Sequence, residues 1–263
     1  MTATMEHNAL LPIVPTICDQ GNSSRKAMGA ELSRLVASFE APNLGQAQEI
    51  SRETDSLGRR RPMMKAMTYR QYGGPDVVTL SEVAKPSPKP KEVLIRILAT
   101  TVTTGDWRAR SLNMPAGFGL LGRVVFGLTG PRQPILGTEL AGIVETVGAE
   151  VTRFRPGDEV IAFTGGRFGG HAEYRTMPED GTIATKPANL SFEEAASLSF
   201  GSMNALPFLR DKARIKRGER VLVVGASGAV GTAAVQIARH FGADVTGVTS
   251  TSNVNLVPEL IIG

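Results

Sequence analysis

The residues with the clearest chemical meaning form a glycine-containing turn, Val224-Gly225-Ala226-Ser227-Gly228-Ala229-Val230-Gly231. An apolar segment, Arg220–Gly225, precedes it, and a helical pattern over Ala229–Phe241 follows it. A pyrophosphate needs close approach to the backbone and free amides at a helix N-terminus. Gly228 has no side chain to block that approach, and Gly231 lets the helix pack closely on the strand. The pattern predicts a dinucleotide site; the alternative is a tight turn that binds no ligand.

The residues around this turn also bear on the choice of cofactor. Ala226 replaces the first glycine of the usual fingerprint, and a second strand over Asp244–Thr249 completes a β–α–β unit. NAD sites usually place an acidic residue after that strand. No Asp or Glu occurs there before Glu259, so a 2′-phosphate is not repelled and NADP(H) is favoured over NAD(H), although no Arg or Lys stands nearby. The expected cofactor contacts are Ala226, Ser227, Gly228, Ala229, Val230, Gly231, Ser250, Thr251 and Asn253.

Residues 64–188 carry short segments of period-two alternation separated by Gly/Pro turns, which predicts a small barrel-like β domain. The glycine- and proline-rich stretch Asn113–Pro134 is expected to be a long surface loop over a cleft. Asp106 is expected to cap a helix over Trp107–Leu112. The expected strands are Lys65–Arg70, Val77–Glu82, Glu92–Val102, Ala141–Val147, Glu159–Phe163 and His171–Thr176.

From residue 189 to residue 263 the pattern becomes that of an α/β domain. Ser191 and Glu194 form a capping box that starts a helix, which is expected to continue over Ala195–Leu209 with Gly201 and Pro207 as weak points. The run Arg220–Gly225 suits a strand buried on both faces of a parallel sheet.

The N-terminal segment, the single cysteine and the net charge limit which kinds of site and partner the sequence can be expected to have. Residues 1–63 are expected to be a poorly ordered tail and linker, with a possible helix over Ala27–Phe39. Cys18 is the only cysteine, so an intramolecular disulfide or a multi-cysteine zinc site is excluded. The net charge of +4 is thinly spread. Arg59–Arg61 is interpreted as a solvated linker, with an anion or nucleic-acid patch as the alternative. Nucleic-acid and membrane partners are not expected, and a cytoplasmic setting fits.

Several motifs occur in a specific order over about Met64 to Val257. They are Tyr72-Gly73-Gly74-Pro75, Gly137-Thr138-Glu139-Leu140-Ala141-Gly142-Ile143-Val144, Arg153-Phe154-Arg155-Pro156-Gly157-Asp158-Glu159-Val160, Gly170-His171-Ala172-Glu173-Tyr174 and the glycine turn. Together they resemble the zinc-independent quinone oxidoreductase branch of the medium-chain dehydrogenase/reductase superfamily. The resemblance implies a mixed β and α/β fold, in which a GroES-like β-barrel domain is followed by an incomplete Rossmann domain.

The resemblance also implies an activity, namely hydride transfer from NAD(P)H to a small-molecule acceptor such as a quinone or enone. Zinc-dependent relatives place a histidine where Thr138 stands, so no zinc is expected. Thr103 could face the nicotinamide, and Asn204 stands where relatives often have a threonine near the cofactor. No catalytic acid is assigned, His171 is interpreted as having a structural or surface role, and intact relatives suggest a homodimer.

The length of the second domain leaves a choice between two functions. Relatives need about six parallel strands in the cofactor domain, whereas the sequence here supplies two, so apolar surface is expected beside Val221–Val224. One interpretation is an NAD(P)H-dependent reductase; the alternative is a noncatalytic truncated remnant with weak or no cofactor binding. RNA binding is poorly supported because no aromatic platform accompanies the basic residues.

Overall fold

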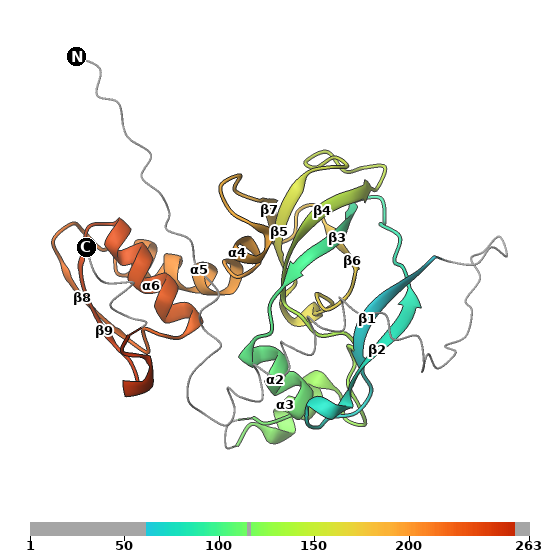
Figure 1. Ribbon diagram of the computed structural model, residues 1–263, viewed down its shortest axis with the longest axis horizontal. Helices are drawn as coiled ribbons and strands as arrows, with labels where there is room; N and C mark the ends of the chain where they lie inside the picture. The colour runs from blue at the N-terminus through green and yellow to red at the C-terminus, as the bar shows by residue number, and fades with distance from the viewer. Residues whose placement is uncertain (1–61, 115–116, 256–263) are drawn as a thin grey trace, which may run out of the picture.

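The structure is a computed structural model that describes residues 62–114 and 117–255. The expected helix over Ala27–Phe39, and all of the expected tail except residues 62 and 63, lie outside the described residues. Figure 1 shows a β-rich part, with β1 to β7, beside a smaller part that contains α5, α6, β8 and β9. No helix in the described ranges is both long enough and apolar enough to span a membrane.

The β-rich part contains two antiparallel sheets. In the first, β1 (Met63–Tyr69) pairs with β2 (Val78–Ala84), and a short helix η2 (Pro75–Val77) joins them. In the second, the strand order is β6-β3-β4-β5-β7. These strands are β3 (Glu92–Thr100), β4 (Glu139–Val147), β5 (Glu159–Phe163), β6 (Tyr174–Pro178) and β7 (Ile183–Thr185). Isolated bridges from Ala66 to Ala172 and from Thr68 to Ile135 join β1 to loops beside this sheet, which agrees with a GroES-like β domain.

The core of this part comes from the inward positions of the alternating strands. Val93, Ile95, Leu140, Val144 and Val160 are almost fully buried and form one hydrophobic cluster. Their spacing of two along β3 follows from the alternation of side chains across a strand. The prediction of strands is therefore confirmed for β3, β4 and β5, although Leu94 is buried between Val93 and Ile95, so β3 does not alternate strictly.

One predicted strand begins later than expected. The prediction of a strand from His171 is wrong, because β6 starts at Tyr174, with a short helix η3 (Gly165–Arg167) further upstream. The backbone N–H of His171 donates to Leu136, and its carbonyl accepts from Met67. These bonds hold residue 171 against the β1 side of the domain, so it does not join the β3 ladder.

The segment predicted as a long loop over Asn113–Pro134 contains a helix, α3 (Gly119–Phe126), so that prediction is wrong for its central part. The helix before it, α2 (Thr104–Ser111), begins earlier than predicted. Thr103 is its N-cap, and Asp106 is the third helical residue of a capping box rather than the cap itself. The sequence prediction assigned the N-cap to Asp106 instead of Thr103, because both side chains are good capping groups.

The predicted single helix over Ala195–Leu209 is wrong, because it is divided into three pieces. These are α4 (Phe192–Ala196), α5 (Ser199–Leu206) and a π-helical turn η4 (Pro207–Lys212). The capping box of Ser191 and Glu194 at the start of α4 is confirmed. Pro207 has no N–H to donate, so the regular helical bonding ends where it stands. The helix α4 packs on β3 and β4, with Ala195 and Ala196 against Ala141.

The predicted β–α–β unit is confirmed. The strands β8 (Arg220–Val224) and β9 (Asp244–Val248) are parallel, and α6 (Ala229–His240) joins them; a short helix η5 (Thr251–Asn253) follows. The run Arg220–Gly225 suits a strand buried on both faces, but only one face of β8 is buried, and the expected apolar surface beside Val221–Val224 is present. Val223 is 9% exposed, whereas Leu222 and Val224 are 63% and 76% exposed. The helix α6 covers one face of the pair, and the other face is open.

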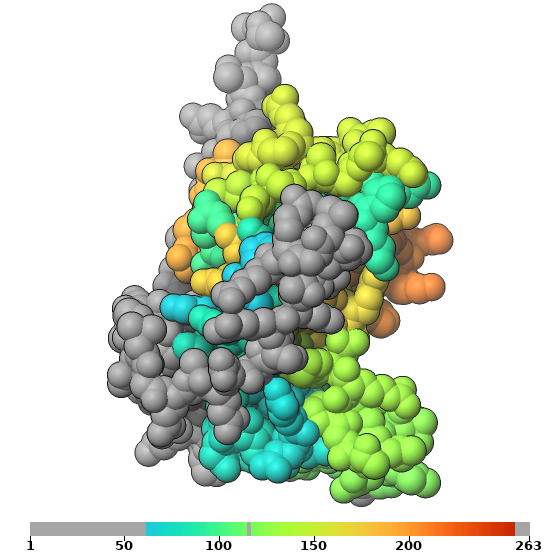
Figure 2. Space-filling view, turned by 90° about the vertical axis from the view of Figure 1, so that its right-hand side faces the viewer, coloured from blue at the N-terminus to red at the C-terminus, as the bar shows by residue number. Residues whose placement is uncertain are grey.

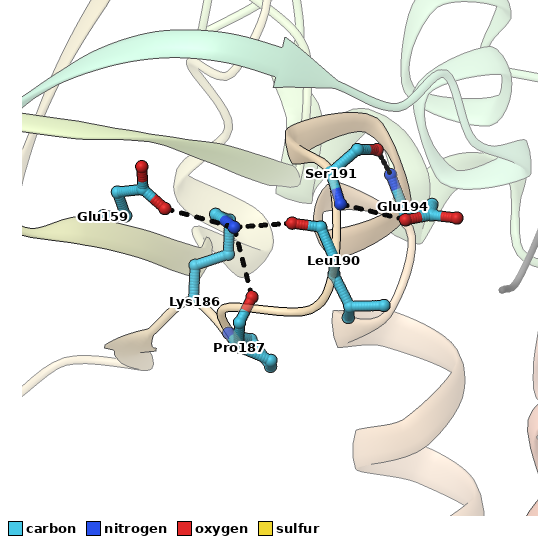
Figure 3. A network of polar contacts seen from close by, with 6 residues as sticks. All are labelled: Glu159, Lys186, Pro187, Leu190, Ser191 and Glu194. Atoms are coloured by element: carbon cyan, nitrogen blue, oxygen red, sulfur yellow. Dashed lines mark hydrogen bonds and ion pairs between the residues drawn. The ribbon is translucent and has the colours of Figure 1, made fainter. Parts of the chain in front are cut away.

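A buried lysine, Lys186, anchors the loop that leads from the β-rich part to α4 (Figure 3). The ammonium of Lys186 donates to the carbonyl oxygens of Leu190 at 2.6 Å and Pro187 at 3.1 Å. It also lies 3.1 Å from the carboxylate of Glu159 on β5. The loop that leads to Ser191 is thereby fixed to the sheet.

Candidate functional site

The glycine turn lies between the end of β8 and the start of α6, at the carboxyl ends of both parallel strands. Gly225 has a positive φ of 78°, which favours glycine. The N–H groups of Gly225 and Ala226 both donate to the carbonyl oxygen of Val248, at 2.8 and 3.0 Å. These bonds fix the turn to the end of β9. The carboxyl ends of β8 and β9 and the N-terminus of α6 therefore lie together at one edge of the sheet.

Two glycines of the turn have different surroundings. A Cβ at Gly231 would overlap the carbonyl oxygen of Gly225 and lie 2.8 Å from the Cα of Ala226, so only glycine allows this approach of α6 to the turn. A Cβ at Gly228 would meet only the oxygen of Gly225, at 3.4 Å, which is ordinary contact. Gly231 therefore has a packing role, whereas Gly228 leaves open space above the turn.

The N-terminus of α6 has no side-chain cap. Its N-cap residue is Gly228, which accepts no hydrogen bond through a side chain. The first N–H groups of a helix have no partner within the helix, and they carry the positive end of its dipole. Ala229, Val230 and Gly231 provide these N–H groups. An open, uncapped helix start beside two strand ends fits the pyrophosphate of a dinucleotide.

Polar side chains after β9 lie against the turn. The Oγ of Ser227 accepts hydrogen bonds from the hydroxyl of Thr249 at 2.7 Å and from the amide Nδ2 of Asn253 at 2.9 Å. Ser227 and Asn253 are buried. Asn253, which was predicted to contact the cofactor, therefore stabilises the turn through its bond to Ser227. The hydroxyl of Ser250 instead lies 3.1 Å from that of Ser252 and is exposed, like Thr251.

Two other predicted contacts, Thr103 and Asn204, have local partners. The hydroxyl of Thr103 donates to Asp106 at 2.7 Å within the capping box of α2. The amide of Asn204 donates to the carbonyl oxygen of Phe200, one turn earlier on α5 at 2.7 Å. Neither residue hydrogen-bonds to the glycine turn among the contacts of the described chain. A contact with a nicotinamide stays a prediction for both.

A buried carboxylate missed by the sequence analysis joins the two parts of the chain. Glu139, at the start of β4, accepts from the hydroxyl of Thr101 at 2.7 Å and from the backbone N–H of Phe200 at 2.6 Å. It is 3% exposed. The available signal was a charged residue at the head of the apolar run Leu140–Val144. Because Phe200 belongs to α5, the carboxylate ties the β domain to the helix that packs on α6.

A second buried carboxylate, that of Asp106, joins α2 to the segment before β4. It accepts from the N–H of Gly137 at 2.8 Å and from the N–H of Thr103 at 2.8 Å. His171 is buried, with Nε2 lying 2.9 Å from the carbonyl oxygen of Thr101. These bonds organise the segment that holds Thr138, and they agree with the structural interpretation of His171.

Burial changes the acidity of two groups in this region. Desolvation is the main cause that raises the pKa of Glu139, although the bonds from Phe200 and Thr101 oppose it. Desolvation, together with Tyr72 and Asp106, raises the pKa of Tyr69 to about 12. The Tyr69 phenol therefore stays protonated at neutral pH. No cluster of three or more His, Cys, Asp or Glu side chains suited to a metal occurs in ranges 62–114 and 117–255.

Comparisons with known proteins agree with this architecture. Residues 89–187 match the family model for the alcohol dehydrogenase GroES-like domain. The chain is 36% identical over 195 residues to a quinone oxidoreductase of Pongo abelii, with 72% of this chain and 54% of the relative covered. It is 38% identical over 225 residues to a 2-methylene-furan-3-one reductase of Solanum lycopersicum, with 81% and 54% covered.

A solved structure gives the same result. The quinone oxidoreductase from Coxiella burnetii superposes with a TM-score of 0.65 at 29% identity, and the match covers 76% of this chain and 60% of that one. The chain spans about half the length of the curated relatives that it matches. The fold is therefore a mixed one, with a GroES-like β domain and part of a dinucleotide-binding domain.

Proposed function

We propose, on the premise that this chain is a quinone oxidoreductase-like member of the medium-chain dehydrogenase/reductase superfamily, that it serves NAD(P)H-dependent reduction. The acceptor in this proposal is a quinone, an enone or a similar carbonyl compound, and no zinc takes part. The relatives named quinone oxidoreductase and 2-methylene-furan-3-one reductase support this class of acceptor. A cytoplasmic location, and a homodimer in intact forms, are parts of the same proposal.

The observation that carries this proposal is the uncapped start of α6 above the glycine turn. The N–H groups of Ala229, Val230 and Gly231 would bind the pyrophosphate, and Gly228 would leave it room. The hydroxyl of Ser250 and the residue Thr251 would face the adenosine ribose. Because no carboxylate lies in residues 249–255, a 2′-phosphate meets no negative charge there, which supports NADP(H).

When bound, the nicotinamide supplies a hydride, and the task of the protein is then to position the reactants and exclude water. Thr103 and Asn204 are the side chains we propose near that ring. Each would exchange its present local hydrogen bond, to Asp106 or to Phe200, for a bond to the carboxamide. The bonds of Glu139 to Thr101 and Phe200 would hold the two parts in register while this occurs.

The test is a titration of NADPH into the purified 263-residue chain, followed by fluorescence and by thermal unfolding, with NADH as the comparison. We expect saturable binding at micromolar concentrations that is weaker for NADH, and a rise in Tm. A screen of quinones and enones for NADPH oxidation then tests the acceptor class. A folded chain whose Tm does not respond to millimolar NADPH would contradict the proposal.

One feature favours a second candidate, a noncatalytic chain that binds the cofactor weakly or not at all. Leu222, Val224 and Val248 expose apolar side chains on the face of β8 and β9 opposite α6. An open apolar face at a two-stranded sheet gives little support to the strand ends that carry the turn. The same titration separates the candidates, because this one predicts a folded chain without a cofactor-dependent rise in Tm.

A further inference from the structure

The helix α3 exposes its apolar side chains to solvent. A surface helix normally buries its apolar face and exposes polar residues. In α3 the inner side consists of Gly122, which is buried, and Phe126, whose ring centroid lies 6.3 Å from that of Phe168. The outward positions are also apolar. The exposed large side chains of this segment are Phe118, Leu120, Leu121, Val124, Val125 and Leu128, which we call the α3 patch.

The spacing places these side chains on one outward face. Leu120 and Val124 are four residues apart, as are Leu121 and Val125, so each pair lies one above the other on the helix. Gly122 and Phe126 have the same spacing on the inner side. Leu120 is 75% exposed. The four helical side chains of the α3 patch therefore lie on the exposed side of α3.

The α3 patch projects from the surface of the molecule. In Figure 2 the bright green segment that contains α3 forms the lower right corner of the face shown, beside blue residues from the start of the described chain. The segment is attached from beneath, since the hydroxyl of Tyr72 donates to the carbonyl oxygen of Gly127 at 2.9 Å. Apolar side chains that project in this way can insert into the interfacial region of a lipid layer.

The charge around the α3 patch has one sign. Residues 112–134 contain Arg123 and Arg132 and no Asp or Glu. Both arginines are exposed. Burial raises the pKa of the Tyr72 phenol, and the positive charges of Arg123 and Arg132 partly oppose this rise, so both arginines lie near Tyr72. A second copy of the α3 patch would bring like charges together. An anionic surface with an apolar interior complements both properties.

We propose that the α3 patch is an interfacial contact for an anionic lipid surface. Leu120, Leu121, Val124 and Val125 would enter the boundary between headgroups and acyl chains, and Arg123 and Arg132 would lie at the phosphate level. This contact needs no spanning segment, and it goes beyond the proposed oxidoreductase activity because it concerns where the chain acts. It depends on neither the glycine turn nor the cofactor.

The test is co-sedimentation of the 263-residue chain with vesicles of phosphatidylglycerol and phosphatidylcholine, and with vesicles of phosphatidylcholine alone. We expect binding to the anionic vesicles that weakens as salt is raised, since salt screens the arginine–phosphate attraction. Leu120→Glu should reduce the partition coefficient at least about tenfold. Arg123→Gln should reduce it about fivefold, in line with about one unit charge at the surface.

Two matched controls separate this site from general stickiness. Phe208→Glu changes another exposed apolar side chain, and Arg155→Gln changes another exposed arginine. Neither should alter the partition coefficient. Circular dichroism and Tm verify that each variant is folded, and the salt dependence of the unchanged chain provides a test that needs no variant.

Three results would overturn the proposal. The first is absence of binding to anionic vesicles by the folded chain, and the second is an equal loss in Leu120→Glu and Phe208→Glu. The third is a dimer in sedimentation analysis that Leu120→Glu dissociates and that anionic vesicles do not, which would assign the patch to self-association. Cofactor titrations would be unaffected in all three cases, so the proposed function is judged separately.

Discussion

The carboxylate oxygen Oε1 of Glu139 lies 2.6 Å from the backbone nitrogen of Phe200, across 61 positions of sequence. The N–H of Phe200 belongs to the first turn of α5, where helix N–H groups have no partner within the helix. Glu139 therefore performs the part of a cap from a strand of the other domain. The bond couples the orientation of β4 to the position of α5 and, through it, of α6.

The pKa of Glu139 makes this bond sensitive to pH. Its pKa is raised above the ordinary value of 4.5, mainly by desolvation, so between the two values the folded state holds more protons than the unfolded state. The free energy of unfolding therefore falls as pH rises through that interval. We expect Glu139→Gln to remove this part of the pH slope, measured by urea unfolding from pH 4 to 7.

At pH 7 the two variants Glu139→Gln and Glu139→Ala separate the effect of the charge of Glu139 from the effect of its hydrogen bonds. Glutamine keeps an acceptor for Phe200 and a group that can bond the hydroxyl of Thr101, so Glu139→Gln should change the free energy of unfolding by less than about 1 kcal/mol. Glu139→Ala leaves the N–H of Phe200 without this acceptor and should cost about 2–4 kcal/mol. Equal effects of both changes would contradict the assigned bonding.

The turn glycines give a prediction that separates folding from cofactor binding. Gly231→Ala should lower the free energy of unfolding by about 1–3 kcal/mol, because the new Cβ overlaps the oxygen of Gly225. Gly228→Ala should cost less than about 1 kcal/mol, since its Cβ meets ordinary contact distances. It should nevertheless weaken NADPH binding by obstructing the approach to α6. Denaturant unfolding and NADPH titration on both variants check this contrast.

The residue after the second strand should control the choice between cofactors. Ser250→Asp adds a carboxylate where the 2′-phosphate is proposed to lie, so the ratio of NADPH to NADH affinity should fall about tenfold, equivalent to about 1.4 kcal/mol. Ser250→Asn is the neutral control and should leave the ratio within about twofold. Isothermal titration with both nucleotides gives the ratio; a shift of equal size in both variants would place the 2′-phosphate elsewhere.

Replacing the buried Lys186 should lower the free energy of unfolding more than replacing an exposed lysine. Lys186→Met leaves the carbonyl oxygens of Leu190 and Pro187 without the ammonium and should cost about 2–4 kcal/mol. Lys91→Met removes an exposed pair with Glu150, 3.9 Å apart, and should cost less than about 0.5 kcal/mol. Thermal unfolding of the two variants measures the difference, and similar Tm values would show that the Lys186 network is unimportant.

Much of the fold could be predicted from local sequence because it depends on local chemistry. The glycine turn, the capping box of Ser191 and Glu194, and the β–α–β order follow from backbone requirements that a few neighbouring residues reveal. Strand alternation in residues 159–163 likewise shows one buried face. These features appear in the structure at nearly the expected positions.

The site needed the tertiary structure, because its polar contacts join distant parts of the sequence. The bonds of Ser227 to Asn253 span 26 positions and those of Glu139 to Phe200 span 61, and no local pattern specifies such partners. The same is true of α3, where Phe126 packs on Phe168, a contact between distant residues in the sequence. Composition and spacing determined the glycine turn and the β domain; packing decided which carboxylate couples them and which apolar residues remain exposed.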